Sequence, residues 1–367
     1  MTKRRILYSA LGVIVVVAGV FFFDRSRTNS SEIVLGVILP LSGELAPFGE
    51  KIRNGVELAL GEFDRNKFKV IYEDTRGAGG KEAVSAYQKL RSIDKANIII
   101  GPFGPEQTLA LAPLADKDKV PVLAVSLCDE RFLPHASVFC TYPAIDTGVF
   151  TASPYLEKLG IDSIALFTMN GEIGLVLEDA LKEVAADHGA VIVGVEKVSP
   201  FSSSERDFRT TLVKLMQKNP EAIYIGSTPE EGHVALKQLY ELGYKGYRFA
   251  QLDSSEEKLD EYGVAMEGVY FPGYISPNYN SKFSSDYEKK FGTAPDLYAA
   301  LGHSSTHYLL DKLASDNWQS EDISAELVSK TDLETAIPGF TFTKDRQVSI
   351  PQVVFRYSQG EFKELSR

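Results

Sequence analysis

Short apolar runs alternate with amphipathic helical patterns along most of this chain, and the alternation constrains the fold more than any other feature. The apolar runs are nearly uninterrupted, as in Ile33–Leu39 and Ile98–Ile100, which suits strands buried on both faces. Between them, apolar residues recur at helical spacing, as at Ile52, Val56 and Phe63. The sequence therefore predicts an α/β protein with parallel sheets covered by helices on both faces.

The alternation occurs twice, which indicates two lobes of the same architecture. The first series ends near Val125, and a second begins near Ile164. A chain of 367 residues is long enough for two such units, each with its own core. We expect the chain to cross between them at Pro143–Gly148 and Val269–Tyr274. The end of the chain is typical of antiparallel strands that turn at Gln359–Gly360.

A Gly/Pro elbow, Gly101–Pro105, follows the central apolar strand. A helix is expected to open at Glu106, with Pro105 acceptable in its first turn. In open α/β sheets, ligands lie beyond the carboxyl ends of the strands, where free amides and the positive end of a helix dipole converge. The elbow is therefore a candidate ligand site, and an ordinary strand-to-helix connection is the alternative.

The N-terminus differs in charge from the rest of the chain. Residues 1–27 carry +4 while the whole chain carries −11, so the remaining residues carry −15. A body this acidic argues against nucleic acid as a partner. Lys3–Arg5 precedes an uncharged run, Ile6–Phe23, that approaches the length of a membrane span. We interpret it as an export signal that stays as an inner-membrane anchor, with a cleaved signal peptide as the competing interpretation.

Both interpretations place the body in the periplasm or outside the cell, where disulfides form. The chain has two cysteines, Cys128 and Cys140, and the sequence leaves open whether they pair. Catalytic motifs are missing: there is no G-x-S-x-G elbow and no metal-spaced Cys/His cluster. His303 and His307 lie four apart without the glutamate of a zinc protease, and we interpret them as surface or packing residues. We therefore expect no enzymatic activity, no metal and no cofactor.

Short segments across the body match one family in their order and spacing. They are Gly36–Gly43, Phe48–Gly49, Asn54–Ala59, Glu73–Thr75, Ile100–Pro102, Val120–Val122, Lys237–Leu239, Leu242–Gly243 and Gly339–Phe342. Through them the chain resembles type I periplasmic solute-binding proteins, in the branch of the leucine/isoleucine/valine-binding proteins of ABC importers. The resemblance implies two Rossmann-like lobes, joined by a three-strand hinge, that close over a ligand.

The resemblance also implies that each lobe is assembled from two parts of the chain. Residues 1–32 form the signal or anchor and a linker. The first lobe takes residues 33–145 and 275–345, and the second takes residues 146–274 and 346–367.

The same resemblance implies a set of ligand-binding residues in the loops that face the cleft. They are Phe48, Phe103, Gly104, Pro105, Ser126, Cys128, Glu172, Ile173, Thr228 and Asp253. Phe48 matches an aromatic residue that covers the ligand side chain. Pro105 stands where the family has a serine that binds a ligand carboxylate, which puts a standard amino-acid pose in doubt.

Four further positions bear on the chemistry of the ligand. Cys128 replaces a threonine that holds the ligand ammonium, and Ile173 replaces a tyrosine, although Glu172 beside it could compensate. Asp253 matches the acid that pairs with the ligand amine, and a helix cap is the alternative role.

The resulting hypothesis is an extracytoplasmic solute-binding protein that captures an amino acid or amine-bearing analogue and delivers it to an ABC permease. The alternative is a membrane-tethered sensor or interaction module that uses the same fold to regulate a membrane or cell-wall partner. The sequence does not identify the ligand, the permease or the oligomeric state.

Overall fold

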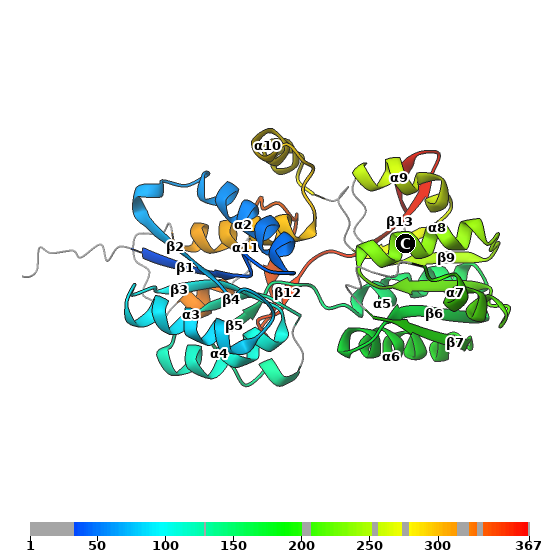
Figure 1. Cartoon of the computed structure of the whole chain (residues 1–367), viewed down its shortest axis with the longest axis horizontal. Coiled ribbons are helices and arrows are strands. Elements are labelled where there is room, and N and C mark those ends of the chain that lie inside the picture. Colours follow the sequence, from blue (N-terminus) through cyan, green and yellow to red (C-terminus); the bar gives the residue numbers. More distant parts are fainter. Residues whose placement is uncertain are drawn as a thin grey trace, which may run out of the picture.

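Two α/β units, joined by crossing segments, make up the protein (Figure 1). The computed structural model describes residues 33–127, 130–199, 207–251, 256–273, 279–313, 323–328 and 333–365. The α/β class and the two lobes with helix-covered parallel sheets are confirmed.

The first lobe is built on a five-stranded parallel sheet in the order β2–β1–β3–β4–β5. Its strands are β1 (Ile33–Leu39), β2 (Phe68–Asp74), β3 (Ile98–Phe103), β4 (Val122–Val125) and β5 (Val138–Cys140). Its helices are α2 (Ala46–Leu60), α3 (Gly80–Ser92), α4 (Pro105–Asp118), α10 (Ser281–Phe291), α11 (Leu297–Leu313) and α12 (Ile323–Leu327), with short 3-10 turns η1 (Arg65–Lys67) and η2 (Glu130–Phe132).

Strand β1 shows how the apolar sequence covers both faces of this sheet. Leu35 and Val37 belong to the core that includes residues of α2 and α11, whereas Val34 and Ile38 belong to the core that includes residues of α3 and α4. Because successive side chains of a strand point to opposite faces, an uninterrupted apolar run serves two cores.

The second lobe has a seven-stranded sheet in the order β14–β13–β10–β9–β8–β6–β7. Its strands are β6 (Ser163–Met169), β7 (Val191–Val198), β8 (Ala222–Gly226), β9 (Tyr247–Ala250), β10 (Tyr270–Gly273), β13 (Val353–Ser358) and β14 (Glu361–Leu365). Its helices are α5 (Thr147–Lys158), α6 (Glu172–Asp187), α7 (Arg209–Met216), α8 (Pro229–Glu241) and α9 (Glu256–Met266). Strands β13 and β14 are antiparallel and turn at Gln359–Gly360, as predicted.

The chain passes between the lobes three times: between β5 and α5, between β10 and α10, and before β13 (Figure 1). The sequence assigns residues 346–367 to the second lobe, but residues 346–349 lie with the first. Gln347 pairs with Cys140 of β5, and β12 (Val348–Ser349) pairs with β11 (Thr341–Phe342). The reason is burial, because Phe342 and Val348 both belong to the core of the first lobe.

Helices α2 and α11 cross with their backbones in contact. A Cβ atom at Gly302 would overlap the carbonyl oxygen of Ile52, and one at Gly55 would overlap that of Ala299. Only glycine permits so close an approach of two backbones. This crossing fixes the relative position of the two helices.

Helix α2 begins earlier than the sequence suggests. The helical spacing seen in the sequence starts at Ile52, whereas α2 begins at Ala46 with Pro47 in its first turn. Proline is tolerated there because the first amides of a helix have no partner within it. Phe48 therefore lies on a helix and not in a loop.

Two expectations about the N-terminus and the cysteines fall partly outside the described residues. The segment Ile6–Phe23 lies outside them, and none of the helices that the structure describes has the length and apolar character needed to cross a membrane. Cys140 is disulfide-bonded, and Cys128 lies outside the described residues.

Candidate functional site

Most of the predicted first-lobe residues lie at the carboxyl edge of its sheet. Phe103 ends β3, Gly104 and Pro105 follow it, and Ser126 directly follows β4. Phe48 lies in the first turn of α2, after β1. Because parallel strands all end at the same edge, these residues are brought to one side of the lobe.

Four half-buried rings form a group at this edge, here called the aromatic cluster: Phe48, Phe103, Tyr142 and Tyr298. The rings of Phe48 and Phe103 are stacked, with centroids 5.7 Å apart and an interplanar angle of 12°. Tyr298, in the first turn of α11, meets their edges at 4.9 and 5.9 Å. Tyr142, just after β5, lies 6.2 Å from Tyr298. Such contacts fall in the range of favourable aromatic pairs.

The Tyr298 hydroxyl gives this apolar group a polar end. Burial raises the pKa of Tyr298 well above its ordinary value, and the nearby Tyr142, Asp296 and Glu230 raise it further. Tyr298 therefore stays neutral and keeps its proton for hydrogen bonding. Glu230 belongs to the first turn of α8, in the second lobe.

The elbow after β3 is held by backbone hydrogen bonds. The Gly104 amide donates to the Val125 carbonyl oxygen at 3.0 Å, and Thr108 donates to the Gly104 carbonyl oxygen through its amide at 3.2 Å and its hydroxyl at 2.7 Å. Gly104 has φ 88°, which favours glycine, and a Cβ atom there would meet no atom within 4 Å. The elbow is therefore fixed in shape, with open space beside Gly104. Ser126 is buried, and its hydroxyl donates to the Leu127 carbonyl oxygen at 2.8 Å.

Two serine/threonine residues stand at the corresponding edge of the second sheet. Ser227 and Thr228 follow β8 directly, and each is 8% exposed. Neither hydroxyl has a hydrogen-bond partner among the described residues, and Thr228 occupies the N-cap position of α8 without capping it. A buried hydroxyl without a partner is rare and costs free energy. These two hydroxyls are therefore suited to a polar group brought in by a ligand.

Glu172 and Ile173 open α6, after β6. The Glu172 carboxylate accepts two hydrogen bonds from Arg131 of η2, with Nη1–Oε1 at 3.1 Å and Nη2–Oε2 at 2.8 Å. Because Arg131 belongs to the first lobe, this ion pair bridges the two lobes. Ile173 packs against the core that includes α5 and α6. The predicted residues Cys128 and Asp253 lie outside the described residues.

The sequence did not single out Tyr142, Tyr298 or Gln251. The two tyrosines join the cluster through contacts between distant parts of the chain, so no local pattern marked them. Gln251, directly after β9, donates through Nε2 to the Ile145 carbonyl oxygen at 2.5 Å and accepts a hydrogen bond from the Tyr224 hydroxyl at 2.8 Å. It thereby holds the first crossing segment against the second sheet.

Comparisons with known proteins agree with this architecture. The profile of the periplasmic binding protein family matches residues 32–361. The chain is 23% identical to Leu/Ile/Val-binding protein homolog 2 of Brucella abortus, over 91% of this chain and 92% of that protein. It is 25% identical to Leu/Ile/Val-binding protein BraC3 of Rhizobium johnstonii, over 92% and 89%.

Solved structures show the same fold. The leucine binding protein LivK of Thermotoga maritima matches with a TM-score of 0.73 and 25% identity, over 91% of this chain and 98% of that one. A solute binding protein of an ABC transporter from Rhodopseudomonas palustris, in complex with 3,4-dihydroxy benzoic acid, matches with a TM-score of 0.78 and 21% identity, over 91% and 96%. The profile match extends over nearly all of the described residues. The chain therefore belongs to the periplasmic binding protein family, whose members are extracytoplasmic proteins that bind solutes.

Proposed function

We propose that this protein captures a small amino-acid-like or amine-bearing solute between its lobes and delivers it to an ABC permease. The observation that carries the proposal is the pairing of two chemically different edges. The first sheet ends in the aromatic cluster, and the second ends in the hydroxyls of Ser227 and Thr228, which have no hydrogen-bond partner within the described part of the chain. The names of the relatives, Leu/Ile/Val-binding proteins, support a ligand of this size and class.

The aromatic cluster would hold the apolar part of the solute. Phe48 and Phe103 offer ring surface, and Tyr298 adds a neutral hydroxyl at the same place. Covering an apolar group with such rings contributes roughly 25 cal/mol for each Å² removed from water. This contribution raises the affinity for solutes with a branched or planar apolar part.

The hydroxyls of the second lobe would hold the polar part. A ligand that hydrogen-bonds to Ser227 and Thr228 removes the free-energy cost of leaving these hydroxyls unpaired. A ligand held at the first lobe reaches them only when the lobes have come together. Contacts from both lobes therefore favour the closed form by the difference in ligand affinity between the two forms.

Two positions, Asp253 and Pro105, bear on the charge of the solute. Asp253 would pair with the ligand amine, as in the resembled family. Pro105 has no amide proton and no hydroxyl, so a ligand carboxylate would have only the amide of Glu106 beyond the elbow. An amine-bearing analogue, including one with an aromatic ring, fits this better than a standard α-amino acid.

The segment Ile6–Phe23 would tether the protein to the inner membrane, with the lobes on the outer side. The protein would bind its solute without converting it.

A thermal-shift screen of the full-length chain with amino acids, amides, amines and aromatic acids tests the function. We expect one class to stabilise the protein, and calorimetry should then give a dissociation constant. Phe48→Ala should weaken solute binding about 10- to 100-fold and Thr228→Val about tenfold, because each variant removes a central contact with the solute. Asp253→Ala should weaken the binding of amines and spare uncharged analogues.

Matched controls keep the test specific. Phe150 and Thr210 are exposed, so Phe150→Ala and Thr210→Val should leave the dissociation constant unchanged. Absence of any stabilising solute, together with a co-purifying membrane partner, would contradict solute capture and favour a tethered interaction module.

A further inference from the structure

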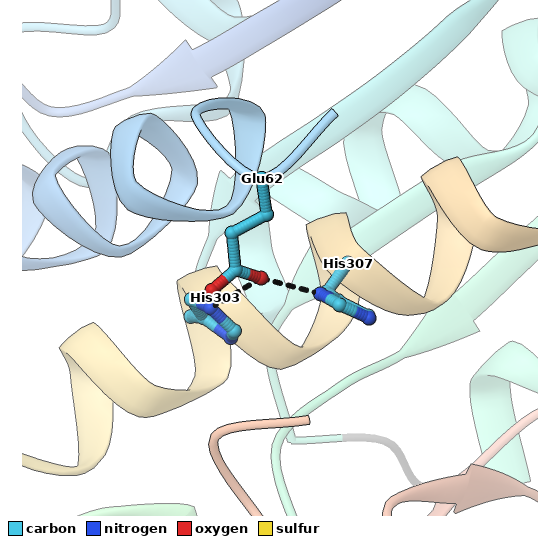
Figure 2. Close-up of side chains that lie close together, drawn as sticks. All are labelled: Glu62, His303 and His307. Atoms are coloured by element: carbon cyan, nitrogen blue, oxygen red, sulfur yellow. Dashed lines mark hydrogen bonds and ion pairs between the residues drawn. The ribbon is translucent and has the colours of Figure 1, made fainter. Parts of the chain in front are cut away.

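A second group of polar side chains lies where α2 ends against α11. Glu62 follows the end of α2, and His303 and His307 stand one turn apart on α11 (Figure 2). Glu62 Oε2 lies 3.3 Å from Nε2 of His303 and 2.7 Å from Nδ1 of His307. Figure 2 shows both rings beside the same carboxylate. Within the part of the chain that the structure describes, these three residues place one ligand atom each within 4.8 Å of the other two.

We propose that Glu62, His303 and His307 form a binding site for a divalent transition-metal ion of the zinc type. Two imidazoles and one carboxylate are a ligand set that Zn²⁺ accepts, with a fourth position left for water. In a tetrahedral site with bonds of about 2.0–2.1 Å, neighbouring ligand atoms are about 3.3 Å apart. The observed separations therefore require only small side-chain movements to admit an ion.

The surroundings of the three residues suit such an ion. The His303 side chain is 3% exposed, and its Nε2 makes no well-formed hydrogen bond within the described structure. Phe283 packs on His303 with ring centroids 4.9 Å apart, and Phe63 packs on His307 at 5.1 Å. Glu62 and His307 remain partly exposed. The site is thus dry on one side and open to solvent on the other, which provides an entry path.

Two contacts compete with the ion and set the conditions for binding. The Ala336 amide donates to Nδ1 of His303 at 3.3 Å, so the ion must move the ring proton from Nε2 to Nδ1 and break this long hydrogen bond. Lys282 Nζ lies 3.5 Å from Glu62 Oε1 and 2.7 Å from Asp286. Lys282 is exposed and can stay with Asp286 when an ion takes its place beside Glu62.

A bound ion would join two helices that also carry two of the four residues of the aromatic cluster. Phe48 lies near the start of α2, and Tyr298 near the start of α11. The ion would hold the end of α2 to α11 and restrict their relative movement. Metal binding itself requires no solute, so it can be tested apart from the proposed function.

Calorimetry of the untagged full-length chain with ZnCl₂ alone tests the site, and we expect one ion per chain. His307→Gln and Glu62→Gln should each weaken binding by more than about tenfold, since even the loss of a supporting residue around a metal costs 10- to 100-fold. Lys282→Ala should strengthen binding about two- to fivefold by removing a competing cation. Co²⁺ should give the visible absorption of a tetrahedral complex, lost in the His307→Gln variant.

His135 provides the matched control, because it pairs with one carboxylate, Asp116 Oδ2 at 2.7 Å, and no third metal-ligating group joins this pair among the residues that the structure describes. His135→Gln should leave Zn²⁺ binding unchanged. Circular dichroism and urea unfolding verify that each variant folds, and His307, which is less buried than His303, is the better position to change. Absence of Zn²⁺ binding, or equal binding by the wild type and the folded His307→Gln and Glu62→Gln variants, would overturn the proposal.

Discussion

The Asp74 side chain holds the loop that leads from β1 to the aromatic cluster. It ends β2, and its carboxylate accepts hydrogen bonds from the amides of Leu41 at 2.8 Å, Ser42 at 3.2 Å and Arg76 at 2.8 Å, and from the Ser42 hydroxyl at 2.6 Å. Burial opposes ionisation, but these hydrogen bonds prevail and lower the pKa of Asp74 from its ordinary value of 3.8. The loop that leads from β1 to Phe48 is thereby anchored to the neighbouring strand.

Replacing Asp74 should destabilise the protein in a pH-dependent way. We expect Asp74→Ala to lower the free energy of unfolding by about 1–3 kcal/mol at neutral pH, because several donors lose their acceptor. A lowered pKa stabilises the fold above the ordinary carboxyl pKa, and this contribution disappears as the pH falls through the folded-state pKa. Urea unfolding at pH 7 and in steps below pH 4 should therefore show the difference between wild type and variant shrinking in acid. Asp187→Ala, at an exposed position at the end of α6, should change stability by under about 0.5 kcal/mol.

At the scale of secondary-structure elements, the α2–α11 crossing positions both the aromatic cluster and the residues of the proposed metal site. Its backbone contact at Gly55 and Gly302 allows Phe48 to meet Tyr298 and Glu62 to meet the two histidines. No side chain can be added at the crossing without separating the helices.

Gly302→Ala should therefore be costly. The added Cβ would overlap the Ile52 carbonyl oxygen, and we expect a loss of at least about 2–3 kcal/mol in the free energy of unfolding. Chemical denaturation measures this loss, and solute affinity should fall as the aromatic cluster loosens. At Gly77, a Cβ atom would meet nothing within 4 Å, so Gly77→Ala is the control. Equal stability of the two variants would contradict the close crossing.

At the scale of the whole molecule, the Arg131–Glu172 ion pair links lobes that are otherwise joined by the crossing segments. Both side chains are substantially exposed, at 42% and 66%. Exposed ion pairs contribute about 0–1 kcal/mol and are screened by salt. The ion pair therefore stabilises this relative position of the lobes only weakly.

A weak, exposed ion pair should have a modest effect on solute affinity. Arg131→Gln and Glu172→Gln should each change the dissociation constant by no more than about fivefold, and the double variant should add little. Calorimetry at low and at about 1 M salt checks this, and the effect should vanish at the higher salt. A loss of 100-fold for Glu172→Gln alone, persisting in salt, would instead mean that Glu172 contacts the solute, as the family resemblance implies.

The features that can be predicted from the sequence are those that a local pattern of residues specifies. Runs such as Ile33–Leu39 predict strands because successive apolar side chains point to opposite faces of a sheet and both faces must be buried. Gln359–Gly360 predicts a hairpin turn, in which both residues adopt positive φ. Phe48 and Phe103 were predicted as site residues through family resemblance, and their stacking adds that they contact each other.

The remaining features depend on contacts between residues far apart in the chain, which no local pattern encodes. The start of α2 at Ala46, the place of β12 in the first lobe and the position of Tyr298 against Phe48 all follow from packing. The same holds for Glu62, which lies 245 positions before His307. The sequence alone determined the alternation of strands and helices and hence two helix-covered sheets, because burial of a periodic pattern is a local requirement. Only the tertiary structure decided which side chains meet. The glycine contacts between α2 and α11 set the distance between these helices, and this distance cannot be derived from the composition or the spacing of residues in the sequence.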